Sequence, residues 1–132
     1  MKRSRRWFLL ATAFLAGCTS SSQLLIELLP NHLDGGWALT ASEPVKTETL
    51  APEIRERGPA SAARAVYDGP ARIVVTICEM KTSTSAFAVF QSWKARDGAQ
   101  AFYHGRLFGI AEGASAAARI QLIRALQPKL PA

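Results

Sequence analysis

The sequence is poor in the residues that build cross-linked or metal-stabilised domains. It has 2 cysteines and 2 histidines in 132 residues. Small secreted domains held together by disulfides carry many more cysteines, and a zinc site needs at least three protein ligands. A disulfide framework is therefore excluded, and the two histidines alone cannot complete a zinc site. We expect neither a cofactor nor a metal.

A strong excess of charge is also missing once the charges are located along the chain. The formal net charge is +6, but Lys2, Arg3, Arg5 and Arg6 supply four of the 16 basic residues, against 10 acidic ones. The rest of the chain is nearly neutral and contains no block of five or more basic residues. Nucleic-acid binding depends on such positive charge, so we expect no nucleic-acid partner.

What the first residues do contain is an export signal. A basic segment, residues 1–6, precedes an apolar segment, residues 7–15, which is too short to span a bilayer as a helix. It leads into a segment that resembles the bacterial lipobox, in which an apolar branched residue and two small residues precede a cysteine: Leu15, Ala16, Gly17 and Cys18. The resemblance implies that residues 1–17 are a signal peptide, that the peptidase recognises residues 15–17, and that Cys18 carries the lipid.

The basic segment is also similar to the twin-arginine export motif, a receptor-read signal for folded proteins. The matching residues are Ser4, Arg5, Arg6, Phe8 and Leu9. Leu10 stands where the motif most often has lysine. General secretory export remains the alternative.

The lipid predicts where the protein resides and which partners it meets. Two acyl chains hold a protein stably on a membrane, since each buried methylene contributes about 0.8 kcal/mol. No later apolar run approaches 18 residues, so we expect the body to lie outside the bilayer. Thr19 follows the cysteine, where aspartate marks inner-membrane retention. We therefore expect the periplasmic face of the outer membrane, with the inner membrane as the alternative, and the export and lipoprotein-processing machinery as partners.

The remaining chain predicts one α+β domain, residues 23–132, joined to the lipid by a polar tether, residues 18–22. We expect an antiparallel sheet with helices packed mainly on one face. Its clearest element is a central strand with a nearly continuous β-branched run. The expected strands are residues 37–40, 45–48, 72–80, 99–103 and 106–110, the last two joined by a turn at His104 and Gly105. The expected helices are residues 24–29, 50–57, 59–67, 86–94 and 114–127.

Cys78, His32 and His104 are the candidates for chemistry. Cys78 lies within the expected central strand, with no helix N-terminus or cationic neighbour to activate its thiol, so we interpret it as a buried core residue. Once Cys18 is acylated, Cys78 has no disulfide partner in the chain. His32 and His104 are interpreted as surface side chains. Six aromatic residues are interpreted as core, or alternatively as the lining of an apolar groove: Trp37, Phe87, Phe90, Trp93, Phe102 and Phe108.

Residues 28–112 resemble a group of exported bacterial proteins of unknown function. Ala88 stands where the family usually has a second glycine. The matching residues read as turns and core, so the resemblance implies a structural pattern and transfers no catalytic residue. They are Leu29, Pro30, Gly36, Trp37, Tyr67, the segment 80–90, Gly105 and Arg106.

These observations favour an envelope lipoprotein with a non-catalytic role in binding or assembly. Two other classes stay open. One is a carrier of a small apolar ligand, with the aromatic residues around a pocket. The other is an enzyme that uses Cys78 with His32 and His104.

The lipid on Cys18 gives the first testable prediction. Cys18→Ala removes the thiol that accepts the lipid, so we expect an uncleaved or soluble precursor that takes up no labelled fatty acid. Incorporation equal to that of the unaltered protein would contradict the lipoprotein hypothesis.

Overall fold

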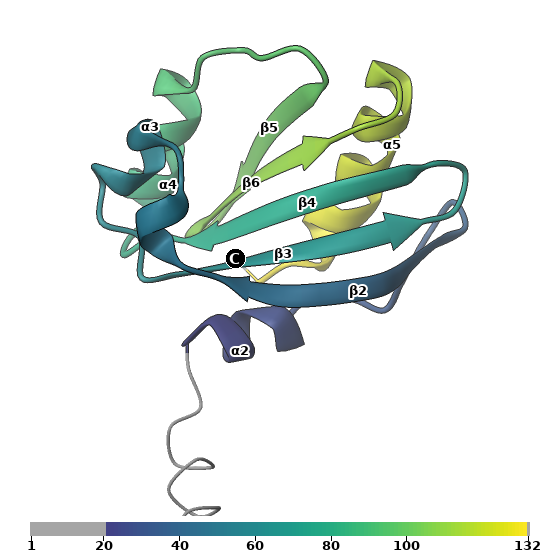
Figure 1. Ribbon diagram of the computed structural model, residues 1–132, viewed down its shortest axis with the longest axis horizontal. Coiled ribbons are helices and arrows are strands. Elements are labelled where there is room, and N and C mark those ends of the chain that lie inside the picture. Colours follow the sequence, from purple (N-terminus) through teal and green to yellow (C-terminus); the bar gives the residue numbers. More distant parts are fainter. Residues whose placement is uncertain (1–20, 132) are drawn as a thin grey trace, which may run out of the picture.

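The computed structural model describes residues 21–131, which form one curled six-stranded sheet with helices against both of its faces (Figure 1). The strand order is β1-β2-β3-β4-β6-β5 and every neighbouring pair is antiparallel. The strands are β1 (His32–Leu33), β2 (Trp37–Val45), β3 (Ser61–Asp68), β4 (Arg72–Glu79), β5 (Ala99–His104) and β6 (Leu107–Glu112).

The helices cover the two faces of the sheet unequally. α2 (Ser21–Glu27) and α5 (Ala116–Leu126) pack on one face, which we call the closed face. α3 (Pro52–Arg55) and α4 (Ser83–Ser92) cover only one end of the other, the half-open face. Two short 3-10 turns, η1 (Thr47–Thr49) and η2 (Gln127–Lys129), complete the elements. The predicted α+β class with an antiparallel sheet is confirmed, and the four helices of residues 21–131 divide two and two between its faces.

The predicted central strand is confirmed as β4, which pairs with β3 on one side and β6 on the other. Its odd-numbered residues Ile73, Val75 and Ile77 face α2 and α5 and are fully buried. Its even-numbered residues point to the half-open face, where Cys78 is buried and Arg72 is exposed. A β-branched run suits a strand with neighbours on both faces.

The prediction of a helix over residues 59–67 is wrong, because this segment is strand β3. Alanine has the highest intrinsic helix propensity, but tertiary packing overrides so weak a preference. Ala63 and Ala65 lie on the closed face beside α2, whereas Ala62 lies on the other face beside Cys78. All three alanines are fully buried. Small side chains here let helices approach a central strand from either side.

Two neighbouring predictions are also corrected. β2 continues through Pro44, where the sequence predicted an interruption. Because β1 pairs only with the first residues of β2, Pro44 lies on a free edge where its missing N–H leaves no sheet bond unmade. The helix expected over 50–57 is only the single turn α3, with Ala51 at its N-cap. Before this turn, the Thr49 hydroxyl donates to the Lys46 carbonyl at 2.7 Å.

The helix expected over residues 86–94 is confirmed as α4, which begins three residues earlier, at Ser83. The Thr82 hydroxyl accepts a hydrogen bond from the Ser85 amide at 3.0 Å and so caps the helix. In α5, Ser115 caps the helix in the same way. Its buried side chains are Arg119, Leu122, Ile123 and Leu126, whereas Ile120 is exposed.

The β5–β6 hairpin is confirmed with its turn shifted by one residue, to Gly105 and Arg106. Gly105 has a φ of +58°, which a tight hairpin turn requires. Within the hairpin, Gly109 lies under the ring of Phe102. A Cβ atom at position 109 would come within 2.2 Å of that ring. Glycine at this position therefore fixes where Phe102 sits.

Several residues of the family resemblance meet at one end of the sheet. The Tyr67 hydroxyl donates to the Pro30 carbonyl at 2.7 Å and ties the loop after α2 to β3. Trp37 and Tyr67 are both buried. Their role in the structure is packing and chain connection, as the sequence pattern implied.

Candidate functional site

The signal, the lipobox and the export motif lie outside the described residues. The predictions for Ser4, Arg5, Arg6, Phe8, Leu9, Leu15, Ala16, Gly17 and Cys18 therefore stay predictions. Within residues 21–131, every helix is too short or too polar to cross a membrane.

Cys78 is a core residue, as predicted. It lies between Ala62 of β3 and Phe108 of β6, beneath α4, and is fully buried. Burial raises the pKa of its thiol from an ordinary value of 9.0 to about 12. The nucleophilic thiolate is therefore disfavoured at neutral pH.

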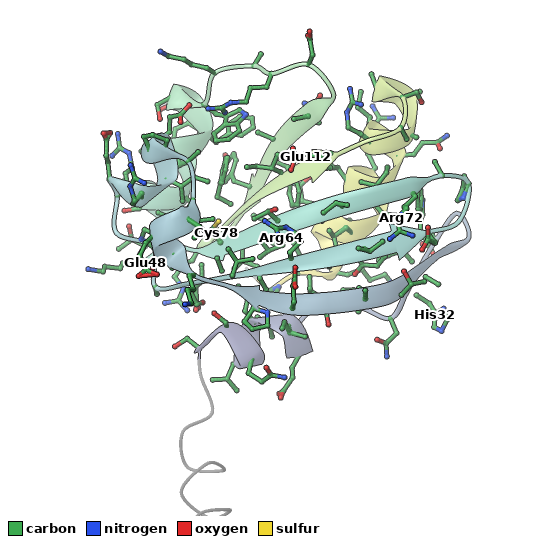
Figure 2. All side chains as sticks on the ribbon, viewed as in Figure 1. His32, Glu48, Arg64, Arg72, Cys78 and Glu112 are labelled. Carbon is green, nitrogen blue, oxygen red and sulfur yellow. The ribbon has the colours of Figure 1, made fainter. Side chains whose placement is uncertain are left out.

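The structure does not bring His32 and His104 together with Cys78. His32 is in β1 and His104 in β5, at opposite edges of the sheet. Figure 2 shows His32 far along the sheet from Cys78. In the part of the chain that the structure describes, no group of three His, Cys, Asp or Glu side chains is placed to hold a metal ion. The catalytic grouping considered from the sequence is thus not assembled.

The candidate site is instead the free edge of the sheet formed by β5. Exposed edges invite pairing with another chain, and most proteins protect them with short strands, lysine or proline. The opposite edge is protected in this way, because β1 has only two residues and Pro44 lies in the exposed part of β2. β5 has six residues, of sequence AQAFYH, and contains neither proline nor lysine.

The register of the hairpin decides which backbone groups of β5 face outward. His104 pairs with Leu107 across a two-residue turn, so it and every second residue before it, Phe102 and Gln100, bond to β6. The backbone groups of Ala99, Ala101 and Tyr103 therefore point away from the sheet. Two of them have partners: the Ala99 amide donates to the Arg96 carbonyl, and the Tyr103 carbonyl accepts from the Gln127 side chain. The other four, which are the carbonyl of Ala99, the amide and carbonyl of Ala101 and the amide of Tyr103, have none among the described residues.

An apolar groove runs along this edge between α4 and α5, which flank β5 in Figure 1. Its volume is about 280 Å³. On the α4 side, Phe87 and Phe90 are 40% and 37% exposed, and their ring centroids lie 5.3 and 5.1 Å from that of Tyr103. On the α5 side, Ile120 is 39% exposed. Large apolar side chains thus stand exposed on both sides of a strand edge, which is typical of a binding surface.

Among residues 21–131, Arg124 is the one charged residue that lines this groove. It lies in the last turn of α5. A partner that carries a carboxylate near the α5 side of the groove would find a favourable charge there.

The sequence predicted this surface only in part. Of the six aromatic residues interpreted as core or groove, Trp37, Phe102 and Phe108 are buried and Trp93 is half-buried. Phe87 and Phe90 are exposed, and Phe90 lines the groove. Their i, i+3 spacing placed Phe87 and Phe90 on one face of a helix. The sequence around this helix did not indicate which element that face would pack against.

Comparisons with known proteins add no identification. No family model, no curated protein and no solved structure matches this chain. The resemblance to exported bacterial proteins therefore remains a prediction.

The buried thiol gives a prediction for Cys78. In a Cys18→Ser variant, Cys78 is the only thiol left. At pH 8 its raised pKa lowers the thiolate fraction by on the order of a thousandfold. We expect slow labelling by a thiol reagent in the folded protein and fast labelling in denaturant. Rapid labelling of the folded protein would contradict the buried position and favour the enzyme hypothesis.

Proposed function

We propose that this protein is a lipid-anchored bacterial envelope lipoprotein with a non-catalytic role in binding or assembly, and that β5 is its recognition element. A partner protein would add an extended segment to the free edge of β5, inside the groove between α4 and α5. The observation that carries this proposal is the coincidence of unpaired backbone groups at Ala101 and Tyr103 with exposed apolar side chains on both sides of them.

Strand addition uses the two parts of this surface differently. Backbone hydrogen bonds supply affinity, and pockets on alternate sides of the added strand supply specificity. A net contribution of about 1 kcal/mol for each bond gives only about 3 kcal/mol for the three unpaired groups of Ala101 and Tyr103. A micromolar complex requires about 8 kcal/mol. The partner must therefore also bury apolar side chains against Phe87, Phe90 and Ile120.

The pattern expected of the partner follows from the geometry. Side chains of an added strand alternate between the two faces of the sheet. One set would contact Phe90 and Tyr103 beside α4, and the other would contact Ile120 beside α5. We therefore expect a segment with apolar side chains on both faces and an acidic residue close to Arg124.

The expected lipid also orients this edge. α2 begins three residues after Cys18, so its first residue would lie within about 10 Å of the lipidated residue. Leu24 of α2 and Leu28, in the turn directly after it, are 55% and 42% exposed. Two such exposed apolar side chains suit contact with a membrane surface. Figure 1 shows α2 against β2 and β3, on the other side of the molecule from β5. The open edge would then face away from the membrane.

The edge is tested by Ala101→Pro combined with site-specific photocrosslinking in cells. Proline removes the outward amide of residue 101 but no bond to β6, so the fold should be retained. With a photoreactive residue at position 120, we expect a discrete adduct with a protein partner, and we expect Ala101→Pro to abolish it. Far-ultraviolet circular dichroism checks that the variant is folded.

A photoreactive residue at position 57 is the matched control, because Arg57 is exposed but lies beyond α3, outside the groove. The proposal is contradicted if position 57 yields the same adduct, or if the adduct from position 120 survives Ala101→Pro unchanged.

A further inference from the structure

A second cavity lies on the half-open face, separate from the β5 groove. It has a volume of about 240 Å³, bounded by the turn before α3, the segment after α4, and the sheet. That volume holds about eight water molecules at liquid density. Its occupant would be of the size of an amino acid.

Thr76 forms the floor of this cavity and has a hydroxyl group that the fold does not use. The residue is only 6% exposed, yet its hydroxyl makes no hydrogen bond within residues 21–131. The hydroxyl is not sealed from the cavity either, since the only fully covered side-chain nitrogen or oxygen without a partner in that range belongs to Arg119. Buried polar groups are normally paired. An unpaired hydroxyl open to a cavity marks a position for a ligand atom.

Charges of opposite sign stand on the two sides of Thr76. Arg64 of β3 pairs directly with Thr76, and Glu112 of β6 lies two residues beyond its partner Ile110. Two strand spacings and two residue steps place the backbones of Arg64 and Glu112 about 12 Å apart. Figure 2 shows Arg64 on β3 and Glu112 on β6, with β4 between them. Both line the cavity, and no ion pair joins them.

Each charge remains available to a ligand. Arg64 contacts Glu43 through one nitrogen only, at 3.3 Å, in a pair whose side chains are 46% and 63% exposed. Exposed pairs of this kind contribute little and exchange readily. Glu112 has no hydrogen bond or ion pair from its side chain among the described residues. By contrast, Arg96 at the rim is held by Glu53 at 3.0 Å and stacks 4.0 Å from the centroid of the Trp93 ring.

Leu50, Ile54 and Ile110 give the cavity an apolar wall, and Thr49 and the paired Arg96 also line it. A simple anion would be repelled by Glu112 and a simple cation by Arg64. We propose that this cavity binds a small zwitterion, an α-amino acid with an apolar side chain. Its carboxylate pairs with Arg64, its ammonium group with Glu112, and its side chain rests on the apolar wall. Thr76 hydrogen-bonds the ligand from below.

Calorimetric titration of the full chain in detergent tests the ligand class. The probes are leucine, leucinamide, which lacks the carboxylate, and 4-methylpentanoate, which lacks the amine. We expect leucine to bind at least tenfold more tightly than either analogue, because each analogue leaves one charged group of the cavity unpaired. Absence of leucine binding up to about 10 mM, or equal binding of a singly charged analogue, overturns the proposal.

Two variants test whether leucine binds in this cavity. Thr76→Val keeps the shape of the side chain and removes only the hydroxyl, and Glu112→Gln removes only the charge. We expect each to weaken leucine binding at least fivefold at an unchanged or higher unfolding midpoint. Arg72→Met is the matched control, since Arg72 lies on the same strand but outside the cavity and pairs with Asp68 at 3.8 Å. Leucine binding that is unchanged in both cavity variants, or lowered equally by Arg72→Met, overturns the assignment to this cavity.

Discussion

Burial of the β3–β4 pair from both faces is the constraint on which the remaining structure depends. At the end of the sheet where Ala62 and Cys78 meet, α3 and α4 pack on one face, while α2 and α5 cover the other. Small side chains let helices approach a strand from both faces, and β3 supplies three buried alanines at this end of the sheet. Each apolar layer stabilises the sheet by removing apolar surface from water. Among residues 21–131, the helices α3 and α4 cover only one end of the half-open face.

The two candidate surfaces arise where that cover ends. On the half-open face, α3 and α4 stop short of Arg64 and Glu112, so the strands carry charged side chains there and a cavity remains between helix and sheet. At the β5 edge, α4 and α5 flank the strand without closing over it, and Gln127 occupies only one outward backbone group. Both surfaces are built on strands of the central sheet and are therefore held rigidly, as recognition sites require.

The sequence predicted those elements whose signals are local. The β-branched run of β4, the threonine cap of α4 and the glycine of the β5–β6 turn each specify their own conformation. The helix predicted over residues 59–67 was wrong because the helix propensity of alanine is a local property. The burial of the β3 alanines between two layers depends instead on residues far along the chain.

The candidate sites were less predictable for the same reason. Arg64, Thr76 and Glu112 lie far apart in the sequence and meet only through the order of β3, β4 and β6. Likewise, Phe87 and Phe90 read as an apolar helix face, and only the position of α4 beside an edge strand leaves them exposed. Cys78 was predictable because its immediate neighbours already described a buried strand.

The central claim is that β5 presents an open edge, and residue-resolved amide hydrogen exchange on the purified full chain tests it most directly. The amides of Gln100 and Phe102 bond to β6, whereas those of Ala101 and Tyr103 point outward. We expect the outward pair to exchange at least about tenfold faster than the inward pair, in a two-residue alternation along β5. Equal protection of all four amides would show that the edge is already paired and would contradict the claim.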